Sequence, residues 1–142
     1  MDIGAKVFKT TDVARIAEVS LRQLQLWEER QVAVASRQGR VRVYDTTETM
    51  FVMLAAELRH RGMSFQKLRR LSGTLRELLV EHRLAEMCRE RQVYLLTDGR
   101  RFHLADSPNK TCELVSNFSQ PLVCINVSDC AQRLHKASVN EF

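Results

Sequence analysis

The chain has 142 residues, of which 44% are hydrophobic and 27% are charged, and its formal net charge is +5. This length allows one ordinary domain or two small ones, and the composition excludes a disordered chain. No apolar run is long enough to span a bilayer, and the first ten residues lack the layout of a signal peptide. We therefore expect a cytoplasmic protein whose four cysteines are reduced thiols.

The positive charge is concentrated in the N-terminal half. Residues 1–72 contain 13 Lys and Arg against 8 Asp and Glu, whereas residues 73–142 contain 9 of each kind. A basic unit suits a polyanion such as nucleic acid, although many solvated surfaces are also basic. The division indicates an N-terminal unit that binds a polyanion and a C-terminal unit with another role.

The first two predicted elements are short helices joined by a tight turn. Thr11 is a suitable N-cap for a helix over residues 12–17. Ser20 is a suitable cap for a second helix, which extends from Leu21 to about Arg30. Two short helices in this arrangement form a helix-turn-helix.

The second helix places two side chains on unexpected faces. At 100° per residue, Leu26 lies opposite the other large apolar side chains, and Glu28 lies on the face that should be buried. A single exposed leucine is common, but the outer face of this helix in a helix-turn-helix enters the major groove, where a leucine can contact a thymine methyl group. A carboxylate on a packed face needs a partner, and we expect Arg42 to supply it.

Residues 36–44 predict a small β-hairpin. Gly39 marks a turn, and Val41 and Val43 alternate with arginines at the period of a strand. The hairpin would form a wing with three arginines near its tip and edge, namely Arg37, Arg40 and Arg42.

Two more helices complete the first half. One of the threonines at 46–47 caps a helix to about Arg61, whose inner face carries three apolar side chains, Phe51, Leu54 and Leu58. A shorter helix over residues 65–71 is capped by Ser64 and ended by Gly73.

Residues 74–92 again predict a helix, but its apolar side chains lie on two sides. Such a helix is usually packed on both sides. It is either the central helix of a small domain or a helix that contacts a dimer partner on one side and the C-terminal residues on the other. The sequence leaves both interpretations open.

The C-terminal residues predict a small α/β module. Apolar runs on both sides of Asp98-Gly99 indicate a β-hairpin. We expect three further elements, which are a helix over residues 110–118, a buried strand over 122–127 and a helix over 129–136 capped by Ser128.

Four stretches of the first half carry a family resemblance: Thr10–Ser20, Leu21–Glu28, Gly39–Tyr44 and Leu58–Leu68. In this order and spacing they resemble the DNA-binding domain of the MerR family of bacterial transcription regulators. The resemblance ends at Ser72. It implies a winged helix-turn-helix domain in the first half. Together with the elements predicted above, the expected fold is a mainly α, winged helix-turn-helix domain followed by a helix and a small α/β module. The expected division is a DNA-binding domain over 1–72, a linking or dimerisation helix over 73–92 and an effector or interaction module over 93–142.

The resemblance also assigns the DNA-binding residues. The family reads DNA with the helix after the Val-Ser turn and contacts the backbone with its wings. The candidates are Ser20, Arg22, Gln23, Gln25, Leu26, Trp27, Arg37, Arg40, Arg42, Tyr44 and Arg61. Trp27 and Tyr44 are candidates for phosphate contacts, and a core role is equally open for Trp27. The segment Gln25-Leu26-Trp27 stands where the family has an arginine and two aromatic rings, which indicates a different operator.

No cofactor or metal site is predicted. The spacing of Cys112, Cys124 and Cys130 matches no metal or cluster signature, and a buried thiol is the simpler interpretation for Cys124. A site formed by these three thiols is a minor alternative. The four histidines form no motif, and the sequence has no nucleophile elbow, phosphate loop or paired carboxylates. We therefore do not expect an enzyme.

The leading functional hypothesis is a sequence-specific transcription regulator that acts as a homodimer on promoter DNA. Its partners would be double-stranded DNA, a second copy of the chain, and RNA polymerase or an unidentified effector, but no membrane. Two alternatives stay open. The protein could be an architectural, excisionase-like DNA-binding protein, or it could be a protein-interaction module for which DNA binding serves only to place it on the DNA.

Overall fold

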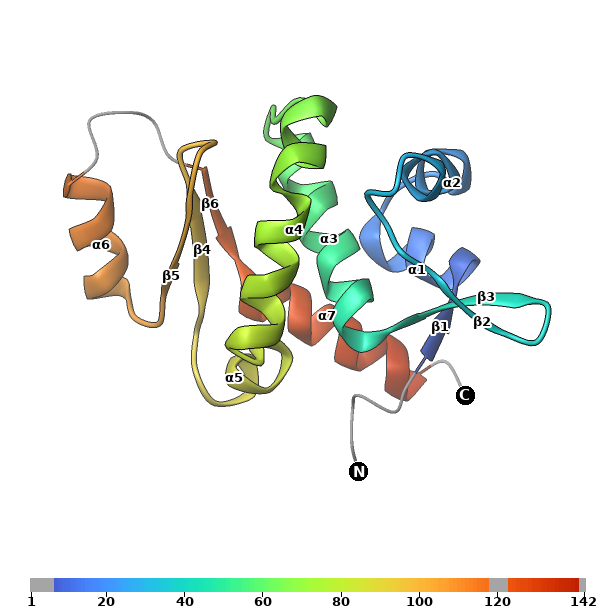
Figure 1. Ribbon diagram of the computed structural model, residues 1–142. Coiled ribbons are helices and arrows are strands. Elements are labelled where there is room, and N and C mark those ends of the chain that lie inside the picture. The colour runs from blue at the N-terminus through green and yellow to red at the C-terminus, as the bar shows by residue number, and fades with distance from the viewer. Residues whose placement is uncertain (1–6, 118–122, 141–142) are drawn as a thin grey trace.

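The computed structural model describes residues 7–117 and 123–140 (Figure 1). In chain order the elements are β1 (Val7–Lys9), α1 (Thr10–Ala17), α2 (Leu21–Glu29), β2 (Ser36–Gln38), β3 (Val41–Asp45), α3 (Thr46–His60), α4 (Phe65–Glu81), α5 (Leu84–Glu90), β4 (Tyr94–Thr97), β5 (Phe102–Ala105), α6 (Pro108–Asn117), β6 (Val123–Asn126) and α7 (Val127–Asn140). Most described residues are helical, and two small antiparallel sheets accompany the helices. The ends of the predicted helix at Phe118 and of the predicted strand at Leu122 lie outside the described residues.

The helix-turn-helix forms as predicted, but α1 begins earlier than expected. Its first residue is Thr10, the N-cap position is Lys9, and no side chain caps it, so Thr11 lies inside the helix. The turn to α2 contains Glu18 in the left-handed conformation, with φ 59°. Ser20 caps α2 as predicted, because its Oγ accepts a hydrogen bond from the backbone N–H of Gln23 at 3.0 Å.

The first sheet has the order β1-β3-β2. The β2–β3 hairpin is the predicted one, and its register places Arg37 opposite Arg42. Strand β1 pairs with the other edge of β3, with Val7 opposite Asp45. The sequence did not predict β1, because three residues are too few to display the two-residue period of a strand.

Helix α3 is the centre of the core. Phe51, Leu54 and Leu58 are fully buried, as predicted, and most other side chains of this helix are also buried. Neither Thr46 nor Thr47 caps it. Asp45 does, since its carboxylate accepts a hydrogen bond from the N–H of Glu48 at 2.7 Å. A carboxylate at this position also suits the helix dipole.

Helix α4 corrects the predicted helix boundaries. It is continuous through Gly73, which has an ordinary helical conformation, and buried Leu75 and Leu79 continue its inner stripe. The chain breaks instead at Arg83, which is left-handed with φ 46°, and α5 follows. Residues 74–92 are therefore not one helix. The break explains the apolar residues on two sides, because it allows Leu84 to be fully buried on a new axis.

The second sheet has the order β5-β4-β6, with β4 paired antiparallel to both neighbours. The predicted hairpin around Asp98-Gly99 is confirmed. Helix α7 begins before Ser128, so Ser128 is not its N-cap. The buried Ser128 hydroxyl instead accepts from the N–H of Val93 and donates to the carbonyl of Arg91, each at 2.9 Å. The Asn126 side chain bonds the N–H of Asp129 at 3.1 Å and takes the capping role.

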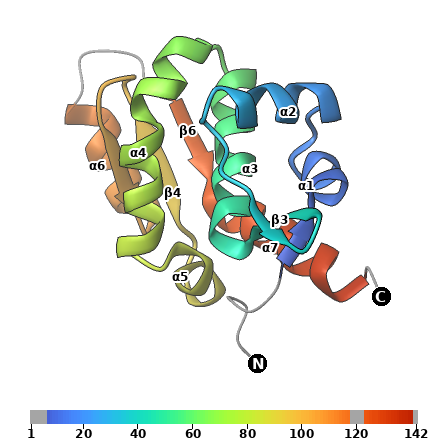
Figure 2. The same cartoon turned by 45° about the vertical axis from the view of Figure 1, so that its right-hand side comes forward.

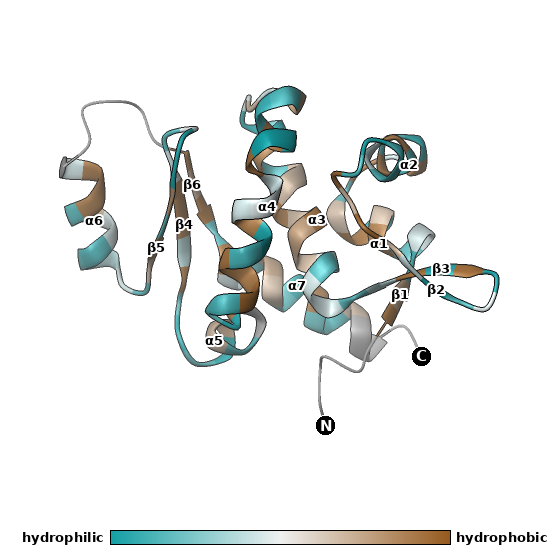
Figure 3. Cartoon of the chain, viewed as in Figure 1, coloured by the Kyte–Doolittle hydropathy of each residue, from teal (hydrophilic) through white to brown (hydrophobic). Residues whose placement is uncertain are grey.

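The two halves share one apolar core. Helix α7 runs from the second sheet beneath α3 and α4 toward α1 and β1 (Figure 1), and it packs against both α3 and α1. Figure 3 shows hydrophobic residues along α3, β4 and β6, while the beginning of α4 is hydrophilic. The Nη1 of Arg133 on α7 lies 3.5 Å from the Glu18 carboxylate, so the C-terminal module contacts the turn of the helix-turn-helix.

Candidate nucleic-acid interface

Helix α2 is anchored by its inner face. Leu24 and Trp27 are almost completely buried, which fixes the rotation of the helix about its axis. The outer face therefore carries Arg22, Gln25 and Leu26, and the Leu26 side chain is 42% exposed. An exposed leucine beside arginine and glutamine side chains is the arrangement that the sequence predicted.

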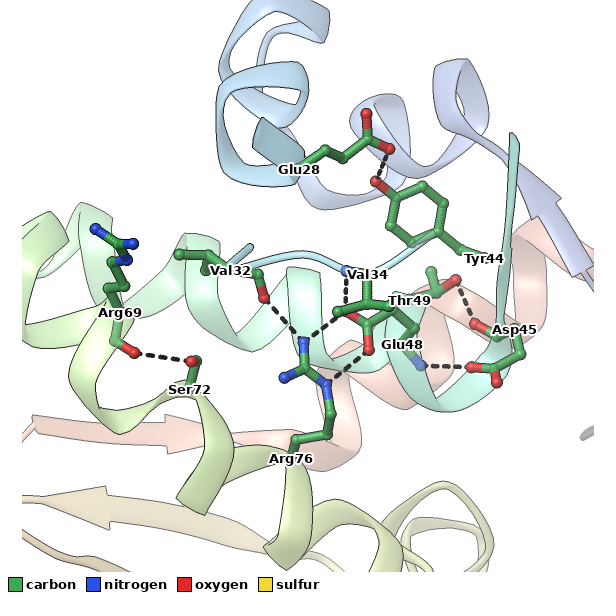
Figure 4. A network of polar contacts seen from close by, with 10 residues as sticks. All are labelled: Glu28, Val32, Val34, Tyr44, Asp45, Glu48, Thr49, Arg69, Ser72 and Arg76. Carbon is green, nitrogen blue, oxygen red and sulfur yellow. Dashed lines mark hydrogen bonds and ion pairs between the residues drawn. The ribbon is translucent and has the colours of Figure 1, made fainter. Parts of the chain in front are cut away.

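Glu28 connects α2 to the β2–β3 hairpin. Its side chain is only 6% exposed, and the Nη1 of Arg42 donates to one carboxylate oxygen at 2.9 Å. The Tyr44 hydroxyl donates to the other oxygen, as Figure 4 shows. The predicted Arg42–Glu28 pair is thus confirmed. Because Arg42 keeps half of its side chain exposed, one guanidinium both holds the hairpin and reaches solvent.

Tyr44 has an internal role. Burial is the largest cause that raises its pKa above the ordinary value of 10.0, and the hydrogen bond to Glu28 adds to it. The hydroxyl is therefore held as a neutral donor. Trp27 and Tyr44 have 1% and 0% of their surface exposed, so their burial does not support the phosphate contacts predicted for them.

The remaining arginine candidates lie on the surface. Arg37 is exposed on β2, and Arg40 follows Gly39 in the hairpin turn. Arg61 lies at the end of α3, where its Nε is 3.7 Å from Glu57. The turn after it is held by the Arg59 guanidinium, which donates to the carbonyl of Met63 at 2.7 Å. The structure thus presents basic side chains on both sides of α2.

Two hollows border the Glu28–Arg42 bridge. One lies between the end of α2 and the hairpin and is lined by Gln31, Ala33, Val34, Ala35 and Arg37. The other lies between α1 and α2 and is lined by Thr10, Thr11, Leu21, Gln25 and Glu29. The bridge forms the common wall of both hollows. Its position therefore fixes the orientation of α2 relative to the hairpin.

A second polar network, which the sequence did not reveal, fixes the segment between α2 and the hairpin. The Glu48 carboxylate accepts from the N–H of Val34 at 2.9 Å, and Arg76 donates to both of its oxygens at 2.9 and 2.8 Å (Figure 4). Arg76 also donates to the carbonyl of Val32 at 2.8 Å and lies over the Phe51 ring, 4.2 Å from its centroid. Its partners are far away in sequence, so no local pattern signals the network.

Three of the four cysteines are poor candidates for a reactive site. Burial raises the pKa values of Cys88, Cys124 and Cys130, which disfavours their thiolate forms. Within residues 7–117 and 123–140, no group of three His, Cys, Asp or Glu side chains is placed to hold a metal ion. In the same part of the chain, no helix combines the length and apolarity needed to cross a membrane.

A helix-turn-helix whose second helix presents polar side chains next to a basic hairpin belongs to the class of DNA-binding proteins. The family comparison agrees: residues 8–73 match the model of the MerR HTH family regulatory protein. These residues therefore form a MerR-family helix-turn-helix domain, a type of domain with which transcription regulators bind DNA, as the sequence predicted. A search of curated proteins found no match to the chain.

Proposed function

We propose that the protein is a sequence-specific transcription regulator that binds promoter DNA as a homodimer, with α2 in the major groove. The observation that carries this proposal is the exposed face of α2, held against the β2–β3 hairpin by the Glu28–Arg42 bridge. The family match over residues 8–73 supports the DNA-binding part.

The outer face of α2 suits direct contact with bases. Arg22 and Gln25 carry hydrogen-bonding groups that can reach base edges or phosphates, and Leu26 can contact a thymine methyl group. Ser20 and Gln23 lie at the start of the helix, where a backbone N–H or a hydroxyl can meet a phosphate. Gln25 and Leu26 differ from the family's usual residues, so we expect the operator sequence to differ from those that other family members bind.

The basic side chains beside α2 suit the DNA backbone. In the proposal Arg37, Arg40 and Arg42 act from the hairpin, as the wing, and Arg61 acts from the turn between α3 and α4. Arginines that neutralise phosphates release counterions, so the affinity should fall steeply with salt. Such contacts position the protein, whereas α2 provides the sequence preference.

One domain of this size contacts few base pairs, and a dimer on two half-sites supplies the missing specificity. The family dimerises through a long helix after the DNA-binding domain. Here that region is divided between α4 and α5, so we propose that the exposed side of α4 around Val80, which is 62% exposed, contributes together with the C-terminal module. We further propose that the module binds an effector or RNA polymerase, and that the protein acts in the cytoplasm.

The test is selection of duplexes from a randomised library by the full chain, followed by fluorescence anisotropy with the selected duplex. Arg22→Ala should weaken binding and relax the preference at one base pair, at a cost of about 1–3 kcal/mol. Arg89→Ala is the matched control, because Arg89 is an exposed arginine on α5, far from α2 (Figure 2). Equal binding of both variants and the wild type would contradict the assignment of α2.

Two further measurements separate the alternatives. Sedimentation with and without the duplex reports whether two chains bind one site. Genome-wide mapping of bound DNA distinguishes a regulator, which occupies defined promoters, from an architectural protein, which occupies many unrelated sites.

A further inference from the structure

The turn between β4 and β5 carries two adjacent arginines that lie outside the residues matched by the family model. Arg100 and Arg101 are both exposed there. Figures 1 and 2 show this turn at the same end of the molecule as α2 and as the turn between α3 and α4. The C-terminal module therefore contributes positive charge at the end that carries the proposed DNA-binding surface.

The turn has a net positive charge, because its two arginines face one acidic side chain. The only acidic side chain in it, Asp98, accepts hydrogen bonds from the backbone N–H groups of Arg100 and Arg101 at 2.9 and 3.1 Å. These bonds lower the pKa of Asp98 and direct its carboxylate toward the backbone. Among the described residues, neither arginine side chain forms an ion pair.

Helix α4 places a third cation against the same turn. A Cβ atom at Gly99 would lie 2.9 Å from the Nζ of Lys67, so the lysine side chain passes directly over this glycine. Gly99 has φ 90°, a conformation that glycine adopts without strain. Lys67 belongs to the first turn of α4, directly after the α3–α4 turn. Lys67, Arg100 and Arg101 thus form one basic group shared by the start of α4 and the β4–β5 turn.

We propose that the β4–β5 turn binds the DNA backbone outside the segment that α2 reads, through Arg100, Arg101 and Lys67. This inference rests on the proposed function. Duplex DNA carries one charge per roughly 1.7 Å of its axis, so a basic surface that continues beyond the α3–α4 turn meets further phosphates. Phosphates fit better than base edges, because a short hairpin turn with two adjacent arginines offers charge but no elongated face for a groove. The C-terminal module would then lengthen the footprint of each protomer.

The experiment uses the full chain and the duplex selected above, prepared with long flanks and with flanks trimmed to the bases that the selection fixed. The affinity of wild type, the double variant R100Q/R101Q and the control R89Q is measured over a range of salt concentrations. Loss of two phosphate contacts per protomer, or four per dimer, should reduce the slope of log K against log salt by about 4 on the long duplex. The trimmed duplex should show no difference between the variants, and R89Q should follow the wild type on both duplexes.

Hydroxyl-radical footprinting provides the second measurement. The wild type should protect backbone positions in the flanks that R100Q/R101Q leaves exposed, while protection of the central backbone positions stays the same. An unchanged slope and footprint in R100Q/R101Q would overturn the inference, as would an equal loss on trimmed and long duplexes. Failure of the proposed function is distinct, because then the wild type itself would select no sequence.

Discussion

Arg76 of α4 holds Glu48 at the start of α3 through two hydrogen bonds of 2.9 and 2.8 Å. Glu48 in turn fixes the backbone of Val34, in the segment that leads from α2 to the hairpin. Arg76 lies beyond residue 73, where the family match ends. The DNA-binding unit of this protein therefore depends on a residue outside the matched range, and α4 continues across that limit without a break.

Replacing Arg76 should destabilise the fold. Arg76→Ala leaves the Glu48 carboxylate, which is 10% exposed, without its charged partner, and the expected loss of unfolding free energy is about 3 kcal/mol. Adding Glu48→Gln should recover part of this loss, because no charge is then left unpaired. Urea denaturation measures both. Arg83→Ala is the control, since the 4.0 Å Arg83–Glu86 pair is highly exposed and should contribute less than about 0.5 kcal/mol. Equal stabilities of R76A and R83A would contradict the role of the network.

The Arg42–Glu28 bridge should affect both stability and DNA binding. Arg42→Ala removes a charged hydrogen bond to a buried carboxylate, at an expected cost of about 1 kcal/mol because half of the arginine side chain is exposed. Thermal unfolding and anisotropy with the selected duplex measure the two effects. Arg40→Ala, in the hairpin turn, should weaken binding while the melting temperature stays unchanged. If R42A melts like the wild type, the bridge does not position the hairpin.

Tyr44 should make the fold sensitive to alkaline pH. Its pKa is raised in the folded state, so the folded chain keeps the phenolic proton at pH values where the unfolded chain loses it. The stability from this group is present below pH 10 and declines above it, by up to about 1.4 kcal/mol per pH unit. Chemical denaturation between about pH 9 and pH 11 tests this slope. Tyr44→Phe should be less stable at neutral pH, and its stability should decline less steeply above pH 10. Identical slopes for the two proteins would refute the assignment.

Gly73 should tolerate alanine, unlike Gly62. A Cβ atom at either position meets nothing within 4 Å, but Gly62 has φ 102° whereas Gly73 is helical. Gly73→Ala should therefore stabilise the protein by about 0.5–1 kcal/mol through helix propensity. Gly62→Ala should destabilise it, because alanine is strained at that φ. A loss of stability in G73A would show that α4 needs flexibility at this position.

The sequence by itself determined the local features of the N-terminal half. The N-cap at Ser20, the β2–β3 hairpin and the outward position of Leu26 depend on neighbouring residues and on helical or strand periodicity, so they are visible in the chain. The Arg42–Glu28 pair was also predictable, since a charge on a packed face requires a partner and the hairpin carried few alternatives.

Tertiary structure decided the features that depend on distant contacts. Gly73 suggested a helix end, but packing of Leu75 and Leu79 on the shared core favours a continuous α4. The burial of Tyr44, the Arg76–Glu48 network and the contact of α7 with the turn at Glu18 join segments that are 16 to 115 residues apart. Local sequence patterns did not indicate that Arg76 would meet Glu48 or that Arg133 would meet Glu18, because those pairings depend on how the apolar faces of distant helices pack.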